Sequence, residues 1–217
     1  MKLYASPVSP FSARVRLALA YKNLPCEVVE MTSAEVHAPA FRDINPIGKI
    51  PVLITDDGQT IVESETIVDY VEDAFPEPPL RLKGAGDLAR MRTAIRLFEN
   101  YVGPPIFRLF EQLDPSARQD ALVADELQRW RRGLALLADV VDDAPYAVCG
   151  RFSQADCVVF PGLVLCEMIA PVFQAGDLIG EQPRLAGYYA KAKADPLLGK
   201  SHAEIMAALA ALHAGRG

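Results

Sequence analysis

This sequence has few of the residues that most often carry redox, metal or nucleotide chemistry. It contains four cysteines, three histidines and one tryptophan in 217 residues. Cys26, Cys149, Cys157 and Cys166 form no Cys-x-x-Cys pair, and no His/Cys cluster has the spacing of a zinc site. A glycine-rich phosphate loop is also missing. The sequence therefore predicts no metal cofactor, and cysteines that stay reduced in a cytoplasmic protein.

Positive charge and long apolar runs are scarce as well. Lys and Arg number 22 against 28 for Asp and Glu, which gives a net charge of −6. Phosphate contacts need a positive surface, so we expect no nucleic-acid partner. The longest uncharged apolar run, residues 157–166, is about half the 20 residues that a membrane span needs. We therefore expect a buried core helix there and no membrane partner. Because a strand-like run follows Met1 directly, we also expect no signal peptide.

The pattern of elements changes along the chain. A hydrophobic content of 51% is ordinary for a globular protein, and 217 residues suffice for one large or two small domains. The first part alternates strands with helices, whereas the second reads as helices throughout. We expect an α/β domain over residues 1–76, a proline-rich linker over 77–86 and an all-helical domain over 87–217. The expected strands cover residues 3–5, 27–31, 51–54 and 60–62; the expected helices begin at Ser9-Pro10 and cover 66–75, 87–112, 118–141, 154–170, 183–194 and 202–213, with a short irregular or helical stretch at 37–44.

Three local features of the first domain could carry chemistry. Ser9 precedes Pro10 at a strand-to-helix junction, where a helix N-terminus stabilises an anion such as a thiolate. Pro51 is compatible with a cis peptide bond that would present the backbone of Ile50 to an extended peptide. Glu63 and Ser64 precede a helix and could bind the ammonium and carboxylate of an α-amino acid. Each feature also has a structural explanation: an N-cap at Ser9, a strand-initiating proline, and a cap at Ser64 beside a solvated acid.

Taken in this order, the features resemble the cytosolic glutathione transferases of the serine type, with a tau-, omega- or zeta-like beginning. Ser9-Pro10-Phe11-Ser12 is similar to that family's catalytic segment, residues 45–53 to its cis-proline segment, and Glu63-Ser64 to its γ-glutamyl-binding segment. Residues 150–156 resemble its helix-capping motif, with Ser153 as N-cap and Asp156 reaching back to it. The resemblance spans the whole chain.

The resemblance implies a thioredoxin-like N-terminal domain, a helical C-terminal domain and a homodimer. It implies that glutathione is a co-substrate whose thiol accepts a hydrogen bond from Ser9. The residues that it assigns to glutathione are Phe11, His37, Lys49, Ile50, Pro51, Glu63 and Ser64. His37 departs from the lysine that some classes place near this position, although a neutral imidazole can still donate one hydrogen bond. Ser6 is a rival to Ser9 as the hydroxyl that contacts the thiol.

The expected reaction is attack of the glutathione thiolate on a small hydrophobic electrophile, in the manner of a detoxifying transferase. Serines at positions 9 and 12 stand where glutaredoxin-like relatives have cysteine; a serine cannot form a mixed disulfide, so we expect no deglutathionylation through an enzyme thiol. An electrophile pocket is expected at Phe98, Tyr101, Phe107 and Arg108, although these could be core or dimer contacts. Three alternatives use the same site: isomerase, dehalogenase and ether-cleaving lyase. Arg108 near the thiol would favour an isomerase with an acidic substrate. A non-catalytic interaction protein of the same fold is a further alternative.

Overall fold

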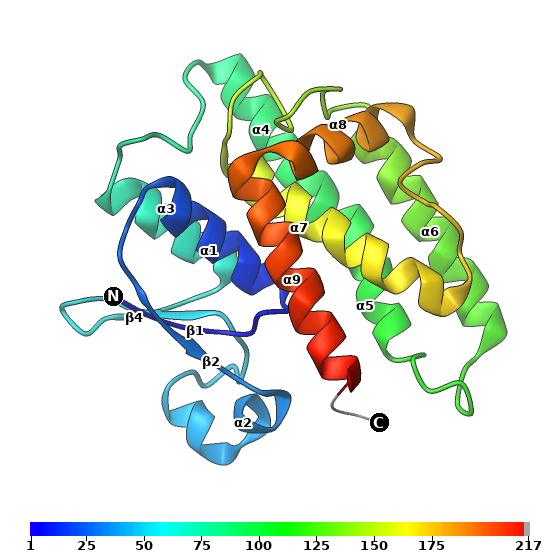
Figure 1. Ribbon diagram of the computed structural model, residues 1–217, viewed down its shortest axis with the longest axis horizontal. Coiled ribbons are helices and arrows are strands. Elements are labelled where there is room, and N and C mark those ends of the chain that lie inside the picture. The colour runs from blue at the N-terminus through cyan, green and yellow to red at the C-terminus, as the bar shows by residue number, and fades with distance from the viewer. Residues whose placement is uncertain (215–217) are drawn as a thin grey trace. The chain divides into compact units, whose positions relative to one another are not determined.

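The computed structural model describes residues 1–214, which form two compact units (Figure 1). Unit 1 comprises Met1–Leu80 and the last helix, α9 (Pro196–Ala214), and unit 2 comprises Arg81–Asp195. We had assigned the last helix to the helical domain, but it packs against the first helix of unit 1. Residues 215–217 of that predicted domain lie outside the described residues. The limits of the two domains as folding units stay a prediction.

Unit 1 is built on a mixed four-stranded sheet in the order β2-β1-β3-β4. Its strands are β1 (Lys2–Ala5), β2 (Glu27–Glu30), β3 (Val52–Ile54) and β4 (Thr60–Val62). β1 runs parallel to β2, and the other two pairs are antiparallel. Leu3 in the centre pairs with both Val28 and Leu53 and is fully buried. All four expected strands are present, in the thioredoxin-like arrangement.

The helices of unit 1 connect and cover these strands. They are α1 (Pro10–Tyr21), α2 (Ser33–His37), the 3₁₀ helix η1 (Pro39–Asp43) and α3 (Ser64–Ala74), besides α9. α1 provides the crossover that a parallel pair such as β1 and β2 requires. α1 and α3 pack side by side (Figure 1), and Val15, Ile67 and Val71 are fully buried between the elements. This packing fixes the N-terminus of α1 at the end of β1.

A buried ion pair closes the C-terminal end of α1. Lys22 Nζ lies 2.7 Å from Glu72 Oε2 of α3, and the two side chains are 0% and 7% exposed. The ammonium also donates to the carbonyls of Phe75 and Pro78, at 2.6 and 2.8 Å. Glu72 in turn accepts from the backbone N–H of Leu80 at 2.9 Å. All three ammonium protons thus have acceptors, which is the condition for burying such a charge.

The regular elements of unit 2 are all helices in the part of the chain that the structure describes. Its elements are α4 (Ala85–Leu97), the π-helical segment η2 (Phe98–Val102), α5 (Gly103–Phe110), α6 (Asp120–Ala138), α7 (Gln154–Ile169), the 3₁₀ helix η3 (Ala170–Phe173) and α8 (Pro183–Ala194). We expected one helix over residues 87–112, but the structure divides this stretch into α4, the π-helical η2 and α5. The change to π-helical bonding comes directly before Pro104 and Pro105, because proline lacks an N–H and its ring clashes with the carbonyl four residues earlier.

Helix α7 is the core of unit 2. Together with η3 it forms an apolar stretch, Gln154–Phe173, that is long enough to cross a membrane, but 78% of its most apolar window is buried inside the protein. It contacts α4, α5 and α8. The expected core helix over residues 157–166 is therefore confirmed. The expected capping motif is also present, with Ser153 as N-cap and Asp156 completing the capping box.

Candidate functional site

The N-terminus of α1 holds a small network of serines. Ser9 is the N-cap, with Pro10 in the first turn, and its Oγ accepts a hydrogen bond from the N–H of Ser12 at 3.3 Å. Ser12 Oγ accepts from the N–H of Ser6 at 3.1 Å. Because Ser9 Oγ is the acceptor in this bond, its own proton is left to be donated to a ligand. The first amides of the helix add partial positive charge at the same place.

Ser6 and Ser9 contribute to this network differently. The hydrogen bonds of Ser6 are made by its backbone: its N–H donates to Ser12, and its carbonyl accepts from the N–H of Ser9 at 3.2 Å. Ser9 uses its side chain at the helix end. Both residues are half-buried and line the same cavity. This geometry favours Ser9 as the hydroxyl that contacts a thiol, and the assignment stays a prediction.

The loop before β3 has the conformation that the sequence allowed for. The Ile50-Pro51 peptide bond is cis. Asn45, which we had not singled out, holds the loop from inside. It is 2% exposed; its side chain donates to the carbonyl of Lys49 at 2.7 Å and accepts from the N–H of Ile47 at 3.0 Å. The sequence signal for this role is that Asn45 stands before Pro46 in a turn, where asparagine side chains hydrogen-bond to nearby backbone. Pro51 is buried, Ile50 is half-buried and Lys49 is exposed.

The start of α3 differs from what we expected. Glu63, not Ser64, is the N-cap, and its backbone has φ 66° and ψ 116°, a region that non-glycine residues rarely occupy. Strained backbone of this kind is concentrated at functional sites. Ser64 is instead the first residue of the helix and is 6% exposed. Its N–H is one of the amides that a helix leaves without an internal acceptor, so an anion can still bind there.

His37 ends the short helix α2 and is exposed. Its Nδ1 lies 2.6 Å from the carbonyl oxygen of Ser33. A carbonyl only accepts, so the proton of a neutral ring must sit on Nδ1. Nε2 is then an acceptor, and it cannot donate to a carboxylate unless the ring is protonated. A neutral His37 thus uses its proton on Ser33 in this conformation, and its assignment to glutathione stays a prediction.

One large cavity of unit 1 brings several of these residues together. It has a volume of about 1380 Å³ and is lined by Ser6, Ser9, His37 and Ile50 among the residues discussed so far. Phe11, Lys49, Pro51, Glu63 and Ser64 are not part of its wall. Phe11 instead packs under the guanidinium of Arg14, 5.5 Å from its ring centre. Cys26 also lines the cavity, and burial raises the pKa of its thiol.

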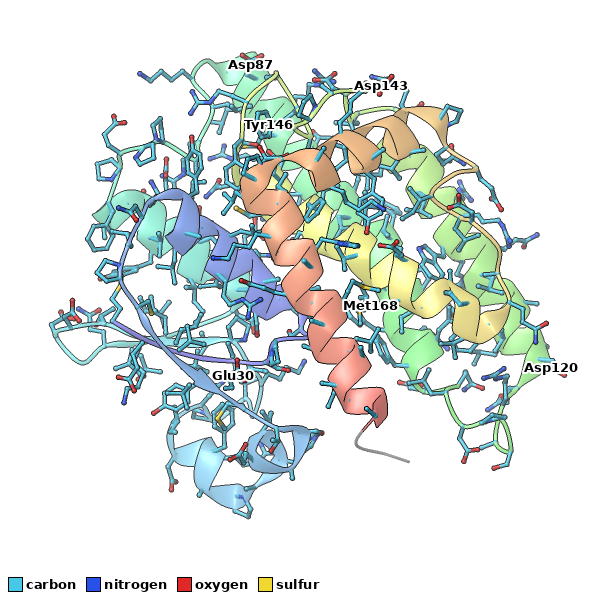
Figure 2. All side chains as sticks on the ribbon, viewed as in Figure 1. Glu30, Asp87, Asp120, Asp143, Tyr146 and Met168 are labelled. Carbon is cyan, nitrogen blue, oxygen red and sulfur yellow. The ribbon has the colours of Figure 1, made fainter. Side chains whose placement is uncertain are left out.

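Several lining residues of the cavity were missed by sequence reasoning. Arg16 comes from α1, Glu30 from the end of β2 (Figure 2), and Lys200, Ser201 and Glu204 from α9. Nothing in the local sequence of α9 places it beside α1, because the two helices are far apart along the chain. Among the side chains that the structure describes, no group of three His, Cys, Asp or Glu could hold a metal ion.

The residues expected to line an electrophile pocket lie in unit 2 and have different environments. Phe98 is 3% exposed, and its ring packs against Gly162 of α7, where an added Cβ would lie 2.1 Å from it. Its assignment to a pocket is therefore corrected to the helical core. Tyr101 and Phe107 are 53% and 37% exposed, and the Phe107 ring stacks with Phe110 at 6.3 Å.

Arg108 is engaged by a buried acid. Its Nε lies 2.9 Å from Glu126 Oε1, whose side chain is 3% exposed. The guanidinium thus compensates a buried carboxylate, to which Arg129 Nη1 also lies at 3.9 Å. This pairing weakens the idea that Arg108 supplies a cationic substrate pocket.

The comparisons with known proteins agree with this architecture. The N-terminal domain family of the glutathione S-transferases matches residues 3–79, and the C-terminal domain family matches residues 120–191. The chain therefore belongs to the cytosolic glutathione S-transferase superfamily.

Individual relatives are similar over most of their length. Maleylacetoacetate isomerase from Pseudomonas aeruginosa is 28% identical over 212 residues, which cover 93% of this chain and 95% of that protein. Glutathione S-transferase 2 from Saccharomyces cerevisiae is 28% identical over 186 residues, 78% of this chain and 77% of that protein. A crystal structure of a Methylobacterium radiotolerans glutathione S-transferase in complex with glutathione sulfonate has a TM-score of 0.79 and 26% identity, covering 92% and 93% of the two chains.

Proposed function

We propose that this protein is a glutathione transferase that activates the glutathione thiol through Ser9 and couples it to a small electrophile. The observation that carries the proposal is the cap of α1. Ser9 Oγ accepts from a helix amide in the wall of a large cavity, so its own proton is not used in that bond and can be donated to a ligand. The relatives named as glutathione transferases and the glutathione sulfonate complex support the choice of glutathione.

The chemical role of Ser9 follows from the pKa of a thiol. An ordinary cysteine thiol has a pKa near 8.5, so only a few per cent is thiolate at neutral pH. A hydrogen bond from Ser9 together with the N-terminus of α1 would lower the pKa of the bound thiol by about two units, or roughly 2.7 kcal/mol. The thiol proton leaves to solvent, and the thiolate sulfur forms a bond to the electrophilic carbon. A leaving group departs in a substitution, or the electron pair takes up a proton in an addition.

The remaining parts of the proposal rest on the family. Ile50 would bracket the cysteinyl part of glutathione with its backbone, and Glu63 and the N–H of Ser64 would bind the γ-glutamyl end. Phe11, Lys49 and Pro51 would complete the glutathione site, and the electrophile would bind beside it in the cavity of unit 1 that Ser9 lines. We further propose a cytoplasmic homodimer with a role in detoxification.

A glutathione-dependent isomerase is the second candidate. It is favoured by the relative from Pseudomonas aeruginosa, a maleylacetoacetate isomerase that the chain matches over nearly its whole length. The same thiolate would add to a double bond, allow rotation about it and then be eliminated, which returns glutathione unchanged.

The test begins with a calorimetric titration of the purified protein with reduced glutathione and with S-methylglutathione. We expect saturable binding of both. The thiolate of bound glutathione is then titrated by its ultraviolet absorbance in the wild type and in Ser9→Ala. We expect Ser9→Ala to keep S-methylglutathione binding and to raise the pKa of the bound thiol.

Ser6→Ala is the matched control, because Ser6 lines the same cavity but makes its hydrogen bonds through the backbone. We expect its thiol titration to follow the wild type. A shift in Ser6→Ala and none in Ser9→Ala would transfer the role to Ser6. No binding of either ligand up to millimolar concentration would reject the proposed function in favour of a non-catalytic protein of this fold.

A further inference from the structure

Arg16 occupies the same face of α1 as Ser9. The two residues are seven positions apart, which is two helical turns and about 10 Å along the axis. The Cα–Cβ bonds of a helix tilt toward its N-terminus, which is the end of α1 that Ser9 caps. Both residues line the cavity of unit 1. A ligand that reaches Ser9 through this cavity therefore passes within reach of a permanent positive charge.

The guanidinium of Arg16 is largely buried but has little bonding. Its side chain is 20% exposed. Within residues 1–214 its hydrogen bonding consists of one contact, from Nη2 to Glu204 Oε2 of α9, at 3.4 Å. A guanidinium has five N–H donors, and ionic hydrogen bonds to carboxylates are normally about 2.7–2.9 Å long. Most of its donor capacity is thus available to the cavity.

Glu204 is a weakly held partner for this arginine. Its side chain is 48% exposed, and it also lies 3.9 Å from Lys200 Nζ, one turn earlier in α9. Ion pairs at such exposed positions contribute little to stability. Glu204 shows that a carboxylate fits at this place, and its long single contact leaves it easy to replace. The cavity wall also carries Glu30 and the exposed Lys200.

We propose that Arg16 is the specificity-determining residue of the co-substrate site and that it selects electrophiles bearing a carboxylate. The carboxylate takes the place of Glu204 and binds the guanidinium through two N–H groups. This inference rests on the proposed function. The cavity has the room it needs, because about 1380 Å³ exceeds the roughly 300–1,000 Å³ of a site for one small ligand.

The test measures binding, so it does not depend on turnover. Calorimetry compares two glutathione conjugates, S-(4-carboxy-2-nitrophenyl)glutathione and the matching 4-carboxamide, which are nearly the same size and differ in charge. S-methylglutathione is titrated in parallel. We expect the wild type to bind the carboxylate conjugate more tightly, and Arg16→Gln to weaken its binding by about tenfold or more while the carboxamide changes little.

Two further variants sharpen the test. Glu204→Gln removes the internal competitor, so we expect it to tighten binding of the carboxylate conjugate and to leave the carboxamide as it was. Lys200→Gln is the matched control, since Lys200 lines the same cavity but its side chain is 76% exposed. We expect it to change the affinities by less than about twofold.

Three outcomes would overturn the inference. One is the same affinity of the wild type for both conjugates, and another is a preference that Arg16→Gln leaves intact. The third is an equal loss of S-methylglutathione binding in Arg16→Gln, which would assign Arg16 to a carboxylate of glutathione itself. In all three cases the wild type still binds S-methylglutathione and the proposed function stands. Failure of the wild type to bind S-methylglutathione would instead reject the proposed function together with this inference.

Discussion

The two units bury a carboxylate in different ways. In unit 1, the carboxylate of Glu72 pairs with the ammonium of Lys22, so its negative charge is compensated by a positive one. In unit 2, Asp156 is 0% exposed, and its hydrogen-bond partners among the described residues are neutral donors. They are the N–H groups of Ala147 and Ser153 at 2.6 and 2.9 Å, and the hydroxyls of Ser153 and Tyr188 at 3.2 Å. Desolvation outweighs these bonds and raises the pKa of Asp156 to about 7. Hydrogen bonds alone therefore satisfy a buried acid without keeping it ionised.

The largest effect is expected from breaking the charged pair in unit 1. Glu72→Ala leaves the fully buried ammonium of Lys22 without a counter-ion and the N–H of Leu80 without its acceptor. We expect a loss of about 3–5 kcal/mol in the free energy of unfolding. Urea denaturation measures the total loss in the free energy of unfolding, and hydrogen exchange of the β1 amides shows that this loss lies in unit 1.

The double variant Lys22→Met, Glu72→Leu is the control for this prediction. It removes both charges, so we expect a smaller loss than in Glu72→Ala. If Glu72→Ala were as stable as the wild type, the ion pair of Lys22 and Glu72 would not stabilise unit 1.

In unit 2, Asp156→Asn is expected to have a smaller effect. Both oxygens of Asp156 accept from a backbone N–H, and an amide presents an NH₂ to one of them. We expect a loss of about 2–3 kcal/mol near pH 5. Trp130, the single tryptophan, is fully buried in unit 2, so its fluorescence reports the unfolding of that unit. If hydrogen exchange of β1 reported a loss of stability and the fluorescence of Trp130 did not, this would contradict the assignment of Asp156 to the stability of unit 2.

The same variant tests the protonation of Asp156. The native carboxyl keeps its proton up to about pH 7, whereas an unfolded aspartate loses it near pH 4. Between these values unfolding releases a proton, so the stabilisation is complete below about pH 4 and is lost as the pH rises toward 7. The gap in stability between wild type and Asp156→Asn should therefore narrow over that range. A constant gap from pH 4 to 7 would mean that Asp156 does not titrate there.

The smallest effects on stability are expected at the two N-cap serines. Ser153 is fully buried and belongs to a complete capping box, whereas Ser9 is half-buried and makes one cap bond of 3.3 Å. We expect Ser153→Ala to cost about 1–2 kcal/mol and Ser9→Ala less than about 1 kcal/mol. Thermal unfolding of both variants measures this. An equal or larger cost for Ser9→Ala would mean that Ser9 acts mainly as a structural cap.

Most secondary structure could be predicted because its signals are local. Ser9-Pro10 starts a helix through contacts that reach only three residues along the chain, and the box of Ser153 and Asp156 has the same range. The Asp57-Gly58 turn between β3 and β4 is equally local. The irregularity before Gly103-Pro104-Pro105 also had a local signal, since each proline removes an N–H from the helix, although α7 accommodates Pro161 in its interior. We missed it by following the apolar periodicity alone.

The site was predictable only in part. The sequence by itself determined which residue types stand at the ends of β1, β3 and α3, and so placed Ser9, Ile50 and Glu63. It did not determine that Glu63 rather than Ser64 would cap α3, or that the carbonyl of Ser33 would lie within hydrogen-bond distance of His37 Nδ1. Only the tertiary structure decided that α9 returns to α1 and brings Glu204 to Arg16, 188 positions away. A contact of that range depends on how apolar faces pack and on the closure of the whole chain between them, which no local pattern encodes.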